Sequence, residues 1–264
     1  MINHSQLLPS ALYLRIREAS VRGVIWGFIG SLYGMLFVIF AVLSSEWEVP
    51  VHPYLFSGVL AGTIGALIYS SMRLAVLMAI IISPVCAILM VFSSTPIAPI
   101  NLLFIIGSVG AVAGALYGRF TTNSRVNRAD AKTLTGFTSG LLVALGYVMF
   151  AKQLSDVPLG VIIGLMCPIT GMIYVSLAPT FIRAFGNMLP PTGDGALVGV
   201  GVAIFLTLCN FVMVHSIDID STGAFHELVH HVQDLMPQAI FGGAIGGVLG
   251  GVVSSLFFNH WQDL

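Results

Sequence analysis

The chain has 264 residues, of which 57% are hydrophobic and 8% are charged, with a formal net charge of −1 and a mean hydropathy of +0.98. Charged residues make up about a quarter of ordinary soluble domains, so this composition excludes that class. The few basic residues stand in short segments without interleaved aromatic residues, which also excludes a nucleic-acid partner.

Apolar segments long enough to cross a hydrocarbon core of ~30 Å recur along the whole chain. They are continuous rather than alternating, which predicts helices and not a barrel. We therefore expect an all-α polytopic membrane protein in contact with the lipid bilayer. The expected transmembrane helices are about eight: Gly23–Ser45, Tyr54–Ser71, Leu74–Phe92, Ile100–Gly118, Leu134–Ala151, Val157–Phe181, Ala196–His215 and Ala239–Phe258.

The first 22 residues precede these spans. Leu8, Leu12 and Ile16 stand beside Arg15 and Arg17. This mixture of apolar and basic residues predicts a short helix that lies on the cytoplasmic membrane surface.

The two halves of the chain resemble each other. Gly58–Gly62 is matched by Gly160–Gly164, and Tyr69 is matched by Tyr174. Internal symmetry is a recurrent feature of transporter folds. We therefore expect two parallel four-helix repeats, 23–119 and 134–258, joined by a basic cytoplasmic linker, 120–133, and followed by a cytoplasmic tail, 259–264.

Glycine and proline mark where the helices would meet or bend. Glycines at four-residue spacing predict close helix packing, and the six glycines of Gly242–Gly251 favour a face for self-association or sliding. Prolines inside spans predict kinks that free a backbone carbonyl. The residues expected to flank a solute pathway are Tyr69, Pro84, Gly164, Pro168, Gly171 and Tyr174.

Charge placement predicts the orientation. Nine of the ten Lys and Arg residues fall on the side of the two termini, and only Lys152 falls on the other side. The positive-inside rule places both termini in the cytoplasm, and we expect a bacterial inner membrane. No Asp, Glu, Lys or Arg stands at the centre of a span, which favours a neutral or backbone-lined pathway.

An outer loop, 216–237, contains the residues that we expect to bind a metal ion. Apolar residues recur there at three- and four-residue spacing, which predicts an amphipathic helix on the outer surface. His226 and His230 stand one turn apart, and Asp234 continues their face. Two imidazoles and a carboxylate in this arrangement can hold zinc or another divalent cation. Asp218, Asp220 and His231 are further candidate ligands.

The segment His226-Glu227-x-x-His230 resembles the zincin metalloprotease signature. That resemblance implies zinc on the two histidines and Glu227 as the catalytic base. The residues around Asp194-Gly195 are similar to the second motif of intramembrane site-2 proteases, although here they precede the histidine helix and are expected on the opposite face.

Three functional classes remain open. A transporter or channel for a small solute or ion is favoured by the repeat and the kinked helices. A scaffold or assembly subunit, forming homo-oligomers or membrane complexes through glycine-rich faces, fits the absence of buried charge. A membrane zinc metalloprotease would use the histidine helix.

Overall fold

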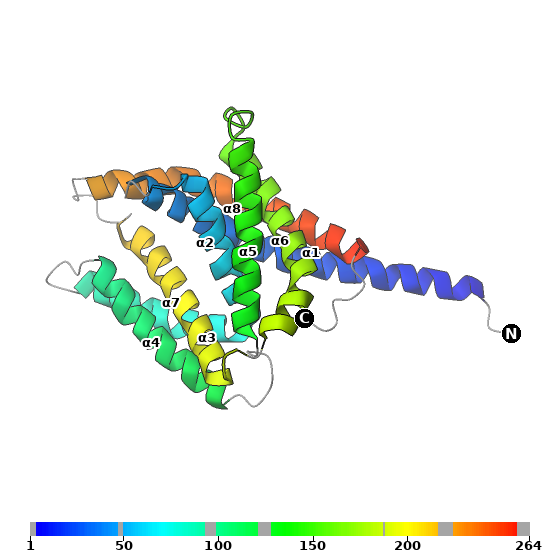
Figure 1. Ribbon diagram of the computed structural model, residues 1–264, viewed down its shortest axis with the longest axis horizontal. Coiled ribbons are helices and arrows are strands. Elements are labelled where there is room, and N and C mark those ends of the chain that lie inside the picture. Colours follow the sequence, from blue (N-terminus) through cyan, green and yellow to red (C-terminus); the bar gives the residue numbers. More distant parts are fainter. Residues whose placement is uncertain are drawn as a thin grey trace.

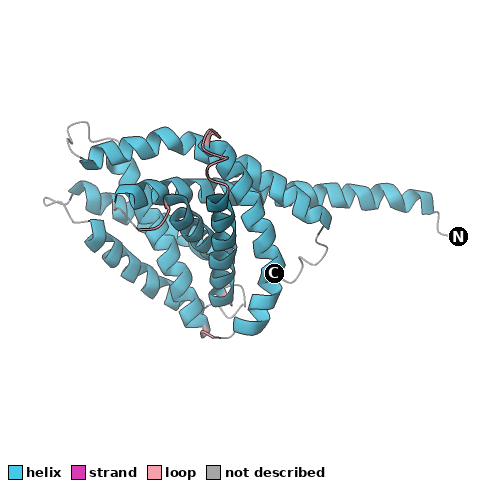
Figure 2. Ribbon diagram, turned by 45° about the horizontal axis from the view of Figure 1, so that its top comes forward, coloured by secondary structure: helices cyan, strands magenta, loops and turns pink. Residues whose placement is uncertain are grey.

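The computed structural model describes residues 4–46, 50–92, 99–120, 128–186, 188–215 and 224–257. All regular secondary structure in these segments is helical (Figure 2). The helices are α1 (His4–Glu46), α2 (Pro53–Ser70), α3 (Met72–Phe92), α4 (Pro99–Phe120), α5 (Ala129–Met149), α6 (Leu159–Phe185), α7 (Pro191–His215) and α8 (Ala224–Phe257). Each predicted span falls on a separate helix.

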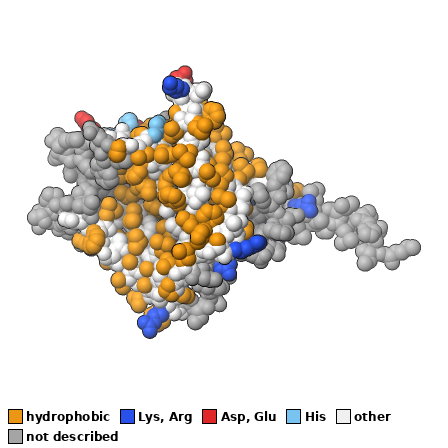
Figure 3. Space-filling view, viewed as in Figure 1, with side chains coloured by type: hydrophobic (Ala, Val, Ile, Leu, Met, Phe, Trp, Pro, Cys, Tyr) orange, Lys and Arg blue, Asp and Glu red, His pale blue; other side chains and the backbone are white. Residues whose placement is uncertain are grey.

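Six helices in the described part of the chain are long and apolar enough to cross a membrane. These segments are Arg15–Ser45, Pro53–Ser70, Asn101–Phe120, Leu159–Phe185, Pro191–Asn210 and His230–Ser255, and α3 adds a shorter apolar stretch, Met72–Val85. Apolar side chains cover much of the face seen in Figure 3, and charged ones lie toward its edges. The protein is therefore an α-helical membrane protein, and the expected class is confirmed.

Two segments expected as separate surface helices are continuous with membrane helices. Residues 4–22 form the first part of α1, which projects from the body of the molecule (Figure 1). The outer amphipathic helix runs directly into the last predicted span, with Pro237 inside α8. Pro237 removes one backbone hydrogen bond there, yet the helix continues on both sides of it.

Glycine brings antiparallel helices into backbone contact. A methyl group added at Gly110 of α4 would lie 2.5 Å from the carbonyl oxygen of Gly199 of α7. A methyl group at Gly62 of α2 would lie 2.7 Å from the carbonyl oxygen of Gly136 of α5. Such approaches are open only to glycine, and they allow dispersion and Cα–H···O contacts between backbones.

The glycines of α8 serve two neighbours at once. Gly243, Gly247 and Gly251 face the backbone or side chains of α1, and Gly242, Gly246 and Gly250 face those of α6. The face that the sequence assigned to self-association or sliding is thus occupied within the chain. Alternate glycines at four-residue spacing produce two adjacent smooth stripes on one helix.

Two groups of helices define the interior. Helices α1, α2, α5 and α6 form a four-helix ring, in which each contacts the next and α6 returns to α1. Helices α3, α4 and α7 form a side layer, seen at the lower left of Figure 1. α8 lies outside the ring along α1 and α6.

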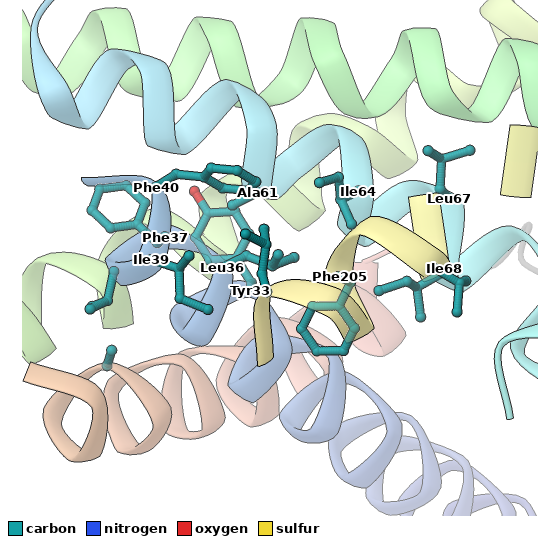
Figure 4. Close-up of a cluster of buried hydrophobic side chains, with 14 of the residues drawn as sticks. Tyr33, Leu36, Phe37, Ile39, Phe40, Ala61, Ile64, Leu67, Ile68 and Phe205 are labelled. Carbon is teal, nitrogen blue, oxygen red and sulfur yellow. The ribbon is translucent and has the colours of Figure 1, made fainter. Parts of the chain in front are cut away.

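The core of the molecule follows α1. Leu36, Phe37 and Val38 are fully buried. In Figure 4 side chains of α1 meet those of α2, including Ala61, and Phe205 of α7 approaches the same cluster. The ring is therefore held together by apolar packing around its first helix.

Candidate functional site: a cavity inside the four-helix ring

A cavity of about 80 Å³ lies inside the four-helix ring. All four helices contribute to its wall, which consists of Trp26, Ile29, Gly30, Tyr33, Ala61, Gly62, Gly65, Ala66, Tyr69, Ser139, Cys167, Thr170, Gly171 and Tyr174. A methyl group added at Gly65 would have no neighbour within 4 Å. The cavity exists because small residues leave space that the opposing helices do not fill.

One end of the cavity is closed by two tyrosines. The rings of Tyr69 and Tyr174 meet edge to face, with centroids 6.2 Å apart and an interplanar angle of 87°. This geometry is a favourable one for aromatic pairs. On α1, Arg22 precedes the cavity-lining Trp26 by four residues and forms an ion pair with Glu18. Charged side chains therefore lie outside the cavity at this end.

The other end is closed by a column of aromatic rings. Tyr33 contacts Phe37 at a centroid distance of 6.2 Å, Phe37 contacts Tyr54 at 5.4 Å, and Tyr54 contacts Tyr147 at 5.1 Å. The ring of His52 lies beside the rings of Tyr54 and Tyr147. The cavity is therefore bordered by the Tyr69–Tyr174 pair and by Tyr33, the first ring of this aromatic column.

A second, wider space lies past the aromatic column. A groove of about 410 Å³ is bounded by the end of α1, the start of α2 and the start of α8. Tyr54 borders both this groove and the column. Glu227 and His231, one turn apart on α8, also line the groove. A route from this groove toward the cavity would pass Tyr54 and Phe37.

Two hydroxyl groups at the cavity wall have no hydrogen-bond partner among the described residues. They belong to Tyr33, whose side chain is 5% exposed, and Thr170, which is 7% exposed. The hydroxyl of Thr170 lies within interaction range of that of Tyr33, but the pair does not reach hydrogen-bond geometry. By contrast, the Ser139 hydroxyl donates to the Gly136 carbonyl at 3.1 Å. An unsatisfied buried polar group costs about 1–3 kcal/mol.

The predicted pathway residues divide into two sets. Tyr69, Gly171 and Tyr174 line the cavity. Gly164 and Pro168 do not: the carbonyl of Gly164, the one freed by Pro168, packs against Gly246 of α8. The kink in α6 thus serves helix packing through a Cα–H···O contact. Pro84 lies inside α3, in the side layer away from the ring.

The predicted metal ligands lie on or before the first turns of α8. His230, His231 and Asp234 have exposed side chains. The side chain of His226, together with Asp218 and Asp220, lies outside the described residues. Within the part of the chain that the structure describes, no three His, Cys, Asp or Glu side chains gather as a metal site.

Two aspartates clasp the starts of α5 and α7 together. The carboxylate of Asp194 on α7 accepts the backbone N–H groups of Arg128 at 2.7 Å and Asp130 at 3.1 Å. The carboxylate of Asp130 on α5 accepts those of Met188 and Leu189, each at 3.1 Å. Asp194 therefore caps the start of α5, and Asp130 binds the segment that leads into α7.

The aspartate clasp accounts for the residues that resemble a site-2 protease motif. Asp194 stands at the start of α7, whereas His230 and Glu227 follow the other end of α7, so the structure does not bring the two parts together. Burial lowers the pKa of the neighbouring Lys132, Arg128 lowers it further, and Asp194 acts in the opposite sense. The polar cluster here is a structural junction.

Sequence reasoning did not identify Tyr33, Thr170 or Trp26. A signal was present, because Thr170 and Tyr174 are four residues apart and Trp26 and Tyr33 are seven apart, so each pair lies on one helix face. Residue spacing did not reveal that these faces point toward each other.

No protein-family model, characterised protein or solved structure matches this chain.

Proposed function

We propose that the protein is a transporter or channel for a small solute, and that the four-helix ring contains its pathway. The observation that supports this is the cavity between the four helices, bordered by Tyr33, Tyr69 and Tyr174, with two buried hydroxyls unpaired at its wall. Irregular packing and unsatisfied polar groups are costly within a membrane, so a site that keeps both calls for a functional reason.

In this proposal the solute enters from the groove beside Glu227 and His231. It passes the aromatic column, occupies the cavity and leaves past the Tyr69–Tyr174 pair. The two aromatic closures would open in turn, since both are closed around one cavity. Such alternation around a central site is how many transporters work.

The proposal includes eight membrane crossings with both termini in the cytoplasm of a bacterial cell. Antiparallel contacts of α1 with α8, α2 with α5 and α4 with α7 agree with alternating directions. Labelling tests this: a cysteine placed within 123–127 should react from the cytoplasm and one at Ser221 from outside. Three crossings, by α5, α6 and α7, separate these positions in the proposal, so reaction of both from one side would refute it.

The proposal also includes two parallel repeats, related by a pseudo-two-fold axis through the ring. The matched residues Tyr69 and Tyr174 touch each other, as equivalent residues near such an axis do. The packing of α1 with α2 and of α5 with α6 agrees with the same relation. The packings of α1 with α8 and of α4 with α7, however, have no comparable counterpart between the described residues of α4 and α5 or of α3 and α8. An experimental structure in which the two halves do not superpose would contradict it.

Metal binding by the outer part of α8 stays a separate proposal. It rests on the spacing of His226, His230 and Asp234. Metal analysis of the purified protein tests it, with wild type compared with the His226→Ala/His230→Ala variant. Equal divalent metal content in both would remove this proposal without affecting the pathway.

The pathway itself is tested through Cys167, which lines the cavity. With Cys86 and Cys209 replaced by serine, Cys167 should react with iodoacetamide or with an uncharged methyl thiosulfonate added to reconstituted vesicles. Gly65→Leu should slow this reaction at least tenfold, because the new side chain fills the cavity without meeting the backbone.

Gly146→Leu is the matched control. It is also a helical glycine of the ring, a methyl group there has no neighbour within 4 Å, and it does not line the cavity. We expect it to leave Cys167 as reactive as in wild type. If neither reagent reaches Cys167 in a folded protein, the cavity is sealed and the scaffold function takes precedence.

A further inference from the structure

The wall of the cavity is uncharged. Among the described residues that line it, none is Asp, Glu, Lys, Arg or His. Moving an isolated ion from water into such surroundings is very costly unless a partner charge or metal compensates it. Aromatic faces attract cations, but each contributes only about 0.5–2 kcal/mol. The surroundings therefore favour an uncharged occupant.

The polar groups of the wall demand an occupant that forms hydrogen bonds. Each hydroxyl of Tyr33 and Thr170 offers one donor and also accepts, and neither has a partner among the described residues. The hydroxyl of Ser139, which also lines the cavity, has its donor taken up by its own helix. A molecule carrying both a donor and an acceptor would satisfy the two hydroxyls at once.

The volume limits the size of that molecule. A water molecule takes up about 30 Å³ of liquid, and the cavity measures about 80 Å³. The space is therefore that of a solute with roughly three to five non-hydrogen atoms. Apolar atoms of such a solute would lie against the faces of Trp26, Tyr69 and Tyr174, which also line the cavity.

We propose that the cavity selects small uncharged solutes of the amide class, which carry a carbonyl acceptor and N–H donors, through the hydroxyls of Tyr33 and Thr170. This inference rests on the proposed function and names its substrate class. Small amides combine the required size, neutrality and hydrogen-bonding groups.

Matched pairs of solutes of nearly equal shape isolate the effect of charge. Acetamide is compared with acetate, and urea with guanidinium, by radiolabelled uptake into proteoliposomes that contain the protein. We expect acetamide and urea to enter well above the rate of protein-free vesicles. Acetate and guanidinium should enter at the rate of protein-free vesicles.

Conservative variants test the two hydroxyls. Tyr33→Phe and Thr170→Val should each lower acetamide uptake about threefold to tenfold, since one hydrogen bond is worth about that factor. Thr63→Val is the control: the hydroxyl of Thr63 already bonds to Val59 of its own helix, at 2.7 Å, and Thr63 does not line the cavity. It should leave uptake unchanged.

A second readout does not depend on transport. Without solute, Tyr33→Phe and Thr170→Val should unfold at the same temperature as wild type or higher, because each removes an unsatisfied hydroxyl. Concentrated acetamide should raise the unfolding temperature of wild type more than that of either variant, as ligand binding to the folded state requires.

The outcomes separate the two proposals. If Cys167 is reachable from water but acetate or guanidinium enters as fast as its neutral counterpart, the pathway stands and the selectivity for uncharged amides is refuted. The same holds if Cys167 is reachable and no amide enters. Amide uptake that Gly65→Leu blocks but Tyr33→Phe and Thr170→Val do not change would refute recognition by the hydroxyls. A sealed cavity would refute both proposals.

Discussion

Glycine closes helix contacts both in the side layer and in the four-helix ring, as at Gly62 with Gly136, but in the ring it also leaves space for a cavity. In the side layer, Gly110 and Gly114 of α4 face the backbone of Gly199 and Gly195 of α7. In the ring, Gly65 faces an open space. Glycine only removes a side chain. Contact results where the opposing helix presents bare backbone, and a cavity results where bulky rings hold the helices apart.

The physical cause lies in the membrane. Helices there are not driven together by the hydrophobic effect, because lipid tails are as apolar as their side chains. Backbone-to-backbone contact must supply the attraction in the side layer. In the ring, the apolar packing of Phe37 and the edge-to-face pair of Tyr69 and Tyr174 hold the helices around the cavity.

The largest effect is expected from filling a glycine contact of the side layer. Gly114→Leu places a side chain against the carbonyl of Gly195, which is backbone and cannot rotate away. We expect a loss of about 3 kcal/mol or more in unfolding free energy, measured by thermal unfolding in detergent. Gly107→Leu is the control on the same helix, where a methyl group has no neighbour within 4 Å. Equal stability of the two variants would contradict the contact.

The next effect comes from the aspartate clasp, which joins the side layer to the ring. Asp194→Ala leaves the N–H groups of Arg128 and Asp130 without their acceptor. Hydrogen bonds to a charged group are worth about 1.5–3 kcal/mol each. For two bonds at the lower end of that range we expect a loss of about 3 kcal/mol in thermal or denaturant unfolding. Asp194→Asn retains one carbonyl oxygen and should lose about half as much. If Asp194→Ala lost less unfolding free energy than Asp194→Asn, the clasp would not join the two regions.

Adding one methyl group to the cavity wall should have the opposite sign. Gly65→Ala meets no atom within 4 Å and improves helix propensity by about 0.5–1 kcal/mol. We expect an unfolding temperature equal to or above that of wild type. The same substitution at Gly114 should lower it, because the added methyl meets the backbone of Gly195. If Gly65→Ala and Gly114→Ala shifted the unfolding temperature in the same direction, the ring and the side layer would not differ in this respect.

The smallest effect is expected within the side layer. The amide of Asn210 on α7 donates to the hydroxyl of Ser83 on α3 at 3.0 Å. Hydrogen bonds between membrane helices average about 0.6 kcal/mol, and Ser83→Ala should cost about that amount in thermal unfolding. Ser108→Ala serves as the control, since Ser108 donates to Phe104 of its own helix. A cost several times larger would mean that this bond holds α3 in place.

The four-residue spacing of glycine, read from the sequence, indicated close packing but left its targets open. Gly164 and Pro168 seemed suited to a pathway, yet they pack on α8, because the carbonyl freed at Gly164 is taken up by Gly246. Tyr69 and Tyr174, matched across the two halves, do meet at the cavity. The same kind of pattern therefore led to a packing contact in one place and to the cavity wall in another.

The all-helical membrane class followed from the sequence alone, because hydrophobicity over some twenty residues depends only on local composition. Each predicted span also falls on one helix, but α1 and α8 begin well before the predicted spans. The cavity required the tertiary structure: Trp26, Tyr33, Gly65 and Thr170 stand on three helices. Which faces of those helices meet depends on contacts between residues far apart in the chain, and no local pattern encodes those contacts. The tertiary structure also decided that Asp194 clasps α5, because its acceptor oxygens found their donors 64 and 66 residues away.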